Sequence, residues 1–298
     1  MSKLHSTRIG LPTGVTLKVQ LGGAEEAEPV IFLHGFPESH RTWRFQMEAL
    51  AADFRVVAPD QRGFGGSDKP EEVDAYKTDR VVEDLFALAD ALDIGAFTLV
   101  GHDWGGAAAW LAALRHPDRV KRLVIVNAPH PLLFQKSLID NEEQRAASQY
   151  INRFRAPRME AMIEAMGLET FFEKSFGAHV DLRKVSDLER RHYLDDWGRP
   201  GALTAMLNWY RASAIEVPEP GDKANRPLWT LAPFPKLAMP VLVVWGMKDK
   251  ALLPIQLEGL HDLVADLRLV LDPDAGHFVP WEKPEVVTGA LRDFMADA

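Results

Sequence analysis

The sequence predicts an α/β fold in which a mostly parallel, doubly wound sheet carries an inserted helical cap. Short apolar runs alternate with helix-like stretches along most of the 298 residues, as in parallel strands joined by crossover helices. The runs lack strict polar alternation, which is typical of strands covered on both faces. The alternation breaks once, from about Pro129 to Pro227. We therefore expect a core of residues 1–129 and 228–298 and a cap of residues 130–227.

The expected elements follow in chain order. The pattern at residues 15–21 predicts an edge-like strand, and short buried strands are expected at residues 30–35, 54–60, 97–101, 123–129, 240–246 and 267–272. Helical periodicity predicts helices at residues 42–52, 78–92, 104–116, 254–265 and 284–296. The region from about Pro129 to Pro227, where the alternation breaks, is helix-like and ends in the Pro/Gly-rich stretch VPEPGDKANRP. A cap there would cover the carboxyl edge of the sheet, where sites in this fold class lie.

Composition narrows the classes of function. Hydrophobic residues make up 47% of the chain, which is enough for a substantial core. The net charge is −9 without a dense Lys/Arg cluster, so nucleic acid is disfavoured as a partner. The lack of cysteine excludes disulfides and thiolate metal sites. No stretch approaches the roughly 18 apolar residues of a membrane span, and the start lacks a signal peptide's apolar core, so we expect a soluble, cytoplasmic protein.

The segment GHDWGG at residues 101–106 is the most informative motif. It joins an apolar run to a helical stretch, and Gly101 and Gly105 are the small residues that a sharp strand-to-helix turn requires. Such a nucleophile elbow pushes its central side chain out above the sheet. Here the central residue is Asp103. A serine in this place forms an acyl-enzyme from a carbonyl substrate. A carboxylate indicates instead displacement at a saturated carbon and an alkyl ester on the enzyme, which is how carboxylates serve as nucleophiles elsewhere.

Hydrolysis of such an ester requires a general base. His277 lies in the loop between the last strand and the final helix, and Asp249 directly follows the strand at 240–246. Asp249 would orient the imidazole and favour its charged form. Taken singly, a loop histidine or a post-strand aspartate is most often a solvated or capping residue. Together with the elbow, in the order nucleophile, acid, histidine, they predict the catalytic triad of an α/β-hydrolase.

Two backbone N–H groups are expected to form an oxyanion hole during ester hydrolysis. HGFP at residues 34–37 follows an early strand, and its turn can aim the Phe36 N–H at the elbow, where the Trp104 N–H is the second donor. The Gly-rich stretch at residues 60–70 lacks the spacing of a dinucleotide loop, so we expect a structural turn. The ten histidines show no metal-ligand spacing, and neither a metal nor a cofactor is expected.

Four segments carry a resemblance to a known family: HGFPESHRTWRFQ, DQRGFGGSDKP, GHDWGGAAAW and GHFVPWEKP. Together they resemble the α/β-hydrolase-fold epoxide hydrolases, with the haloalkane and haloacetate dehalogenases as near neighbours. The resemblance covers essentially the whole chain. It implies an α/β-hydrolase fold with a helical cap, a small-molecule epoxide and water as reactants, and no cofactor.

Epoxide hydrolases of this type usually place two tyrosine hydroxyls over the nucleophile. Tyr210 in LNWYRA matches the family's motif around the second tyrosine, and Tyr150 in SQYINRFRAP resembles the segment around the first. An opening epoxide builds charge on its oxygen, which must meet a weak acid or a hydrogen-bond donor. Tyrosine supplies this donor without becoming an anion at neutral pH. Without such a context, a cap tyrosine packs its ring and bonds to backbone.

The implied cycle has two half-reactions. Asp103 attacks a ring carbon while Tyr150 and Tyr210 polarise the oxirane oxygen, which leaves a hydroxyalkyl ester on the enzyme. His277, backed by Asp249, then activates water against the ester carbonyl. The product is a vicinal diol.

Two alternative functions remain open from the sequence. A haloalkane dehalogenase normally holds the leaving halide with side-chain N–H donors, one of them from the position of Phe36, and phenylalanine cannot donate. A haloacetate dehalogenase is expected to carry arginine where this chain has Trp104. A binding module without catalysis is disfavoured, because nothing about stability requires Asp103 in a strained turn. The sequence thus favours an epoxide hydrolase, and it leaves a homodimer open as the assembly.

Overall fold

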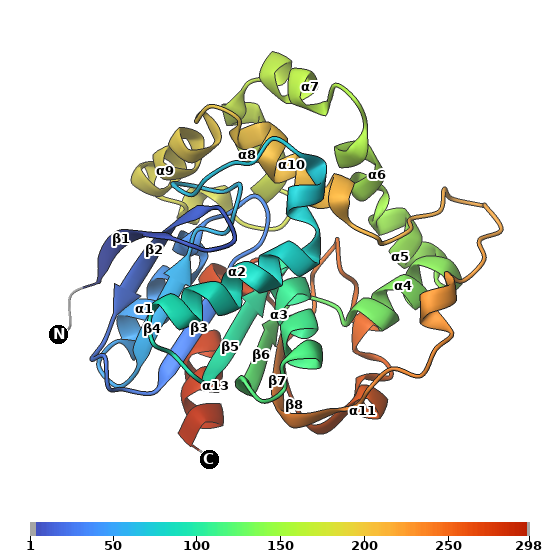
Figure 1. Ribbon diagram of the computed structural model, residues 1–298. Helices are drawn as coiled ribbons and strands as arrows, with labels where there is room; N and C mark the ends of the chain where they lie inside the picture. Colours follow the sequence, from blue (N-terminus) through green and yellow to red (C-terminus); the bar gives the residue numbers. More distant parts are fainter. Residues whose placement is uncertain (1–3, 297–298) are drawn as a thin grey trace.

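The structure, a computed structural model, describes residues 4–296. Within these residues eight strands form one sheet in the order β1-β2-β4-β3-β5-β6-β7-β8. The strands are β1 His5–Gly10, β2 Thr16–Gly22, β3 Pro29–Leu33, β4 Arg55–Pro59, β5 Phe97–His102, β6 Val120–Val126, β7 Leu237–Gly246 and β8 Val264–Asp272. β2 pairs antiparallel with β1 and β4, and the other pairs are parallel. The predicted mostly parallel α/β sheet is therefore confirmed (Figure 1).

Helices flank the sheet and fill one long connection. The flanking helices are α1 Arg44–Leu50, α2 Thr78–Ala91, α3 Trp104–Arg115, α11 Leu260–Leu263, α12 Val279–Glu282 and α13 Pro284–Ala296. The chain between β6 and β7 forms α4 Pro131–Asp140, α5 Glu142–Ala147, α6 Gln149–Arg155, α7 Met159–Met166, α8 Leu168–Phe176, α9 Asp187–Trp197 and α10 Ala202–Ala212. We call these seven the inserted helices, and they lie above and to the right of the sheet in Figure 1.

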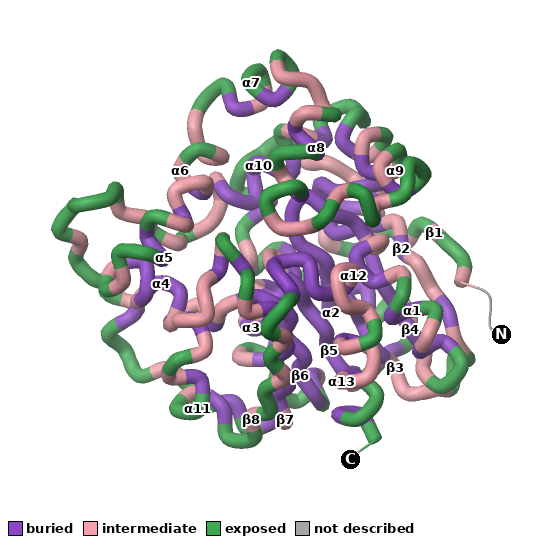
Figure 2. The backbone as a smooth tube through the Cα atoms, turned by 180° about the vertical axis from the view of Figure 1, so that it is seen from behind, coloured by how far each residue is buried: buried purple, intermediate pink, exposed green. Residues whose placement is uncertain are grey.

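The core has two layers because side chains along a strand alternate in direction. In β3, Ile31 and Leu33 pack in the layer that holds α2 and α3, whereas Val30 and Phe32 pack in the layer with α1 and α13. Both faces of the central strands are thus buried, as Figure 2 shows. This double burial explains why these strands read as continuous apolar runs in the sequence.

Three elements differ from the sequence-based expectation. β1 is absent from the prediction, because this strand is mostly exposed and carries no apolar run. β8 was expected to be buried, but it is the last strand of the sheet, and its Leu269 and Leu271 side chains are each 44% exposed. The helix expected at residues 254–265 is a 3₁₀ turn followed by the short α11. Gly259 separates the two with a φ of 81°, which a continuing α-helix does not allow.

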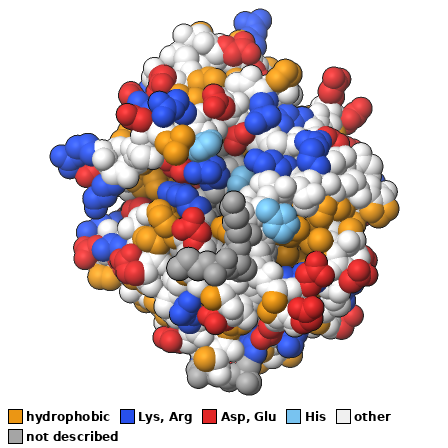
Figure 3. Space-filling model, turned by 90° about the vertical axis from the view of Figure 1, so that its left-hand side faces the viewer, with side chains coloured by type: hydrophobic (Ala, Val, Ile, Leu, Met, Phe, Trp, Pro, Cys, Tyr) orange, Lys and Arg blue, Asp and Glu red, His pale blue; other side chains and the backbone are white. Residues whose placement is uncertain are grey.

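The surface carries both signs of charge. Figure 3 shows one face of the molecule, on which acidic and basic side chains are interspersed. The chain has 43 Asp and Glu residues against 34 Lys and Arg residues, which gives its net charge of −9. Among residues 4–296, no helix is both long enough and apolar enough to cross a bilayer.

The strand register gathers four loops at one edge of the sheet. Leu33 pairs with Gly101, so the turn after β3 lies beside the turn after β5. Gly246 pairs with Asp272, so the loops after β7 and β8 are also neighbours. The N–H of Met247 continues this pairing with a 2.9 Å hydrogen bond to the carbonyl oxygen of Asp272. Residues that are far apart in the chain therefore meet where the parallel strands end.

Candidate active site

Asp103 occupies the sharp turn between β5 and α3. Its backbone has φ 51° and ψ −121°, a strained conformation for a residue with a side chain. The surrounding backbone approaches so closely that only glycine fits. A Cβ on Gly35 would lie 2.3 Å from the Cβ of Asp103, and a Cβ on Gly105 would lie 2.3 Å from the carbonyl oxygen of Leu33. The turn therefore holds the Asp103 side chain out beyond the end of β5.

The two oxygens of the Asp103 carboxylate have different surroundings. Oδ1 accepts a hydrogen bond from the Phe36 N–H at 2.7 Å. Oδ2 lies 3.6 Å from Nε2 of His277. Burial alone would raise the pKa of the Asp103 carboxyl, but hydrogen bonding and the positive charge of His277 hold it below its usual value. Asp103 is thus an anion at neutral pH, the form in which a carboxylate can attack carbon.

Asp249 holds the imidazole of His277 from the other side. Oδ2 of Asp249 lies 2.7 Å from Nδ1 of His277 and accepts the side-chain amide of Asn127 at 2.8 Å. Oδ1 accepts the N–H groups of Ala251 and Leu252 at 2.8 and 2.9 Å. Burial favours the neutral acid, but the charge of His277 and these hydrogen bonds lower the pKa of Asp249. Nδ1 of His277 therefore carries a proton toward Asp249, and Nε2 is left to face Asp103.

Tyr150 and Tyr210 come from two of the inserted helices, α6 and α10. Their ring centroids are 6.1 Å apart, and the rings are nearly perpendicular. Arg155, the last residue of α6, donates to the carbonyl oxygens of Tyr210 and Ile215 at 2.8 and 2.7 Å, which joins α6 to the end of α10. Burial and the negative charge of Asp103 raise the pKa of both tyrosines well above the usual value. Both hydroxyls are therefore protonated at neutral pH.

Two residues next to Asp103 also surround Tyr210. The rings of Phe36 and Trp104 meet its ring edge-on, with centroids 5.0 and 5.1 Å away. Trp104 is the first residue of α3, so its N–H has no acceptor within the helix. Phe36 and Trp104 thus position Tyr210. Their N–H groups are also the two that were expected to form the oxyanion hole.

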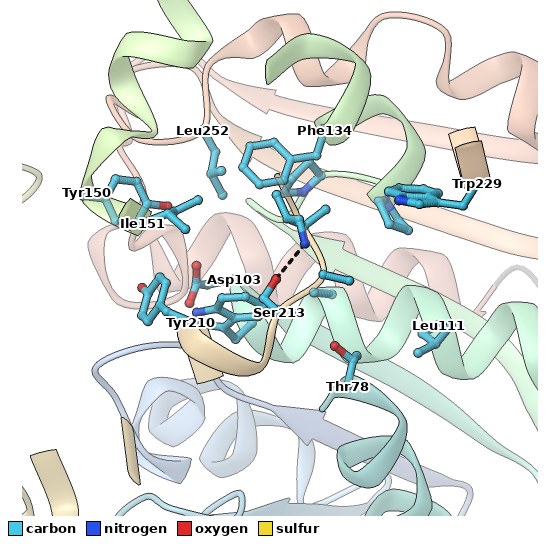
Figure 4. A pocket seen from close by; sticks show the side chains of 16 residues that line it. Thr78, Asp103, Leu111, Phe134, Tyr150, Ile151, Tyr210, Ser213, Trp229 and Leu252 are labelled. Carbon is cyan, nitrogen blue, oxygen red and sulfur yellow. Dashed lines mark hydrogen bonds between the residues drawn. The ribbon is translucent and has the colours of Figure 1, made fainter. Parts of the chain in front are cut away.

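Two cavities share Asp103 as a lining residue. The first has a volume of about 200 Å³, and Figure 4 shows Asp103, Tyr150 and Tyr210 at one end of it and Trp229 toward the other. The second has a volume of about 320 Å³, and His277 lines it. Asp103, Tyr150 and Tyr210 are the residues that line both cavities. An atom at this junction would lie against the carboxylate and both tyrosines, and water could reach Nε2 of His277 through the second cavity.

Comparisons with known proteins show the family of this chain. Residues 28–284 match the family model described as alpha/beta hydrolase fold. The chain is 31% identical to epoxide hydrolase A of Mycobacterium tuberculosis, across 95% of this chain and 94% of that protein. The chain belongs to the α/β-hydrolase-fold epoxide hydrolases. The resemblance found in the sequence motifs is thereby confirmed.

Two further matches extend over nearly the whole length of this epoxide hydrolase family member. A solved structure described under novel epoxide hydrolases in metagenomes from hot environments is 45% identical and superposes with a TM-score of 0.89, covering 98% of this chain and 99% of that one. The AB hydrolase superfamily protein YfhM of Bacillus subtilis is 32% identical, over 95% of each chain. Both matches include the sheet and the inserted helices.

Two buried polar residues outside the predicted site support it. Asn127 follows β6 with a φ of 38°, and besides its bond to Asp249 it accepts the Gly246 N–H at Oδ1, at 2.8 Å. His102 precedes Asp103, and its Nε2 donates to the carbonyl oxygen of His277 at 2.9 Å. Asparagine tolerates the left-handed conformation, so an Asn directly after a buried strand is the one signal that could have indicated Asn127.

Proposed function

We propose that this protein hydrolyses epoxides to vicinal diols through an ester on Asp103. The observation that carries the proposal is the junction of the two cavities, which is lined by the Asp103 carboxylate and by Tyr150 and Tyr210. A nucleophile and two hydroxyl donors around one small volume are what the opening of an epoxide ring requires. The relatives named as epoxide hydrolases support the same activity. The inserted helices act as a cap that brings the hydroxyl donors to the nucleophile.

In the first half-reaction, Oδ2 of Asp103 forms a bond to a ring carbon, and the ring C–O bond at that carbon breaks. Oδ1 is held by the Phe36 N–H and becomes the carbonyl oxygen of the ester. The oxygen released from the ring takes a proton from Tyr150 or Tyr210. Because the charge of Asp103 contributes to the raised pKa of both tyrosines, ester formation makes them stronger acids as this proton is needed.

His277 supplies the proton that returns the tyrosine to its protonated form in this step. Burial disfavours its charged form, but Asp249 and Asp103 raise the pKa of His277 well above the usual value, so the free enzyme holds an imidazolium. The imidazolium proton replaces the one that the tyrosine gave up. Once the Asp103 charge is gone, His277 is neutral and can act as a base.

In the second half-reaction, neutral Nε2 of His277 takes a proton from water while the hydroxide adds to the ester carbonyl carbon. The N–H groups of Phe36 and Trp104 stabilise the resulting oxyanion. Its collapse breaks the bond between the ester carbonyl and the diol oxygen. The step releases the diol and restores the Asp103 carboxylate and the His277 imidazolium.

The experiment that tests this function compares two reactions of the same nucleophile. The purified protein is given styrene oxide and, in parallel, a set of terminal haloalkanes, and diol and free halide are measured. We expect diol without halide, because the side chain of Phe36 has no N–H to hold a leaving halide, whereas two hydroxyls face the nucleophile. Halide release without diol would overturn the proposal in favour of a dehalogenase. An Asp103→Asn variant should lose whichever activity is found.

A further inference from the structure

The two cavities that meet at Asp103 differ in charge. Apart from Asp103 itself, the first cavity is lined by uncharged side chains, among them Phe134, Trp229 and Leu252. Among the described residues, Asp103 is also the only carboxylate that lines the second cavity, which has four basic side chains, Arg153, Lys174, His179 and Lys250. An extended substrate that reacts at the junction would therefore have one arm in an apolar cavity and the other in a basic one.

Three of the four basic side chains carry a positive charge at neutral pH. Burial and the nearby His277 lower the pKa of His179 to about 4, so its imidazole is neutral. The side chains of Arg153 and Lys174 form no ion pair or hydrogen bond with another described residue. Lys250 donates only to the carbonyl oxygen of Ala178, at 3.0 Å. Their charges are not neutralised by carboxylates within residues 4–296.

The three charged residues are exposed, and they line the same cavity as Asp103 and His277. Arg153 follows Tyr150 by three residues on α6, so the two side chains lie on the same face of the helix, about 4.5 Å apart along its axis. Lys250 directly follows Asp249, the partner of His277, and Lys174 approaches from α8. A short chain extending from the junction into the second cavity would bring its end group among the three cations.

We propose that the second cavity binds an anionic group, a carboxylate or a group of like charge, on one arm of the epoxide substrate, while the apolar cavity takes a hydrocarbon arm. This inference rests on the proposed function. The negative charge of Asp103 repels an anionic substrate, so without the cations a neutral ester would bind better than the corresponding acid. One exposed ion pair contributes little, but three cations that converge on one cavity can reverse this order.

The test compares terminal epoxy acids of increasing chain length with their methyl esters. We expect the wild type to favour the acid in kcat/KM by about fivefold or more at low salt, with the difference mainly in KM, and to lose this preference at high salt. In the double variant Arg153→Gln, Lys174→Gln the acid-to-ester ratio should fall about tenfold. A ratio taken within one variant cancels any general loss of activity.

A matched control separates a local effect from the change in net charge. Lys223 and Lys236 are exposed and line neither cavity, so Lys223→Gln, Lys236→Gln removes two charges elsewhere and should leave the ratio unchanged. If the wild type shows no preference for the acid, or if both double variants change the ratio equally, the anion site is wrong, while diol formation from styrene oxide would still support the proposed function.

A binding measurement keeps the inference testable if no epoxide is hydrolysed. Calorimetric titration with undecanoic acid and with undecanamide compares a carboxylate with a neutral group of similar size. We expect tighter binding of the acid to the wild type and loss of this preference in Arg153→Gln, Lys174→Gln. Equal binding to the wild type would overturn the anion site whatever the activity of the protein.

Discussion

The Glu282 carboxylate holds the backbone on both sides of His277. Oε2 accepts the N–H of Gly276 at 3.0 Å, and Oε1 accepts the N–H of Phe278 at 2.8 Å. Glu282 ends the short helix α12, so the loop that holds His277 is tied to the element that follows it. The two bonds fix the loop on either side of the imidazole, and the position of Nε2 therefore depends on them.

We predict that Glu282→Gln slows ester hydrolysis more than ester formation. The amide has only one oxygen, so one of the two N–H groups is left without an acceptor, at a cost of about 1–3 kcal/mol in the free energy of unfolding. Single-turnover kinetics should show accumulation of the alkyl-enzyme, and urea titration measures the stability. Glu285→Gln, an exposed neighbour, is the control. Equal slowing of both half-reactions in Glu282→Gln would contradict a specific effect on His277.

His277→Gln should spare ester formation and stop ester hydrolysis, because the base acts only in the second half-reaction. Intact-protein mass spectrometry after mixing with an epoxide should show a long-lived adduct of substrate mass, and peptide mapping should place it on Asp103. If the variant forms no adduct with an epoxide that the wild type consumes, the role assigned to His277 is wrong.

Removing one tyrosine hydroxyl should slow ester formation without loss of packing. Loss of one donor to a developing oxyanion typically costs about 10²-fold or more. We expect Tyr150→Phe and Tyr210→Phe each to be slower, with partial compensation by the remaining tyrosine, and the double variant to be nearly inactive on epoxides. The readout is the rate of adduct formation in the first turnover. Full activity of the double variant would remove the main support for epoxide opening.

The pKa of His277 should fall when the charge of Asp103 is removed. Burial lowers this pKa, but the two aspartates together raise it well above the usual value, so each carboxylate favours the imidazolium. In Asp103→Asn, which imitates the neutral ester, NMR titration of the His277 ring protons should give a lower pKa than in the wild type. The neutral base then forms at a lower pH in the ester than in the free enzyme. An unchanged or higher pKa would contradict the proposed proton balance.

The origin of the new oxygen distinguishes attack by Asp103 from direct attack by water. In the ester route, the diol of a first turnover receives a carboxylate oxygen, because water attacks the ester carbonyl and not the substrate. One turnover with excess enzyme in ¹⁸O-labelled water should give mostly unlabelled diol and leave label in the peptide that contains Asp103. Fully labelled diol in the first turnover would exclude the covalent route.

The sequence was sufficient for the central strands, because burial on both faces leaves a continuous apolar run such as that of β5. It was insufficient at both ends of the sheet. β1 has exposed side chains, and the apolar residues of β8 do not reveal that the strand lies at an edge. The helix expected at residues 254–265 is interrupted at Gly259. The sequence did not reveal this, because helical periodicity continues across a glycine that adopts a left-handed conformation.

The same contrast applies to the site. Asp103 and His277 could be proposed from the sequence because the chemistry of a turn and of a loop after a strand leaves motifs in it. Asn127 and Glu282 act through hydrogen bonds to residues that are distant in the chain or to bare backbone, and an ordinary Asn or Glu looks the same wherever its partner lies. Such supporting residues become visible only when strand register brings their partners together.

β6 and β7 are neighbours in the sheet, yet the inserted helices lie between them in the chain. Under the proposed mechanism, the donors that open the ring belong to this insertion, whereas Asp103, His277 and Asp249 belong to loops of the sheet. The inserted helices could therefore be exchanged between relatives. The range of accepted substrates would then change with the helices, and the sheet that receives them would still complete the ester hydrolysis. Selection can thus diversify the first half-reaction while the second stays fixed.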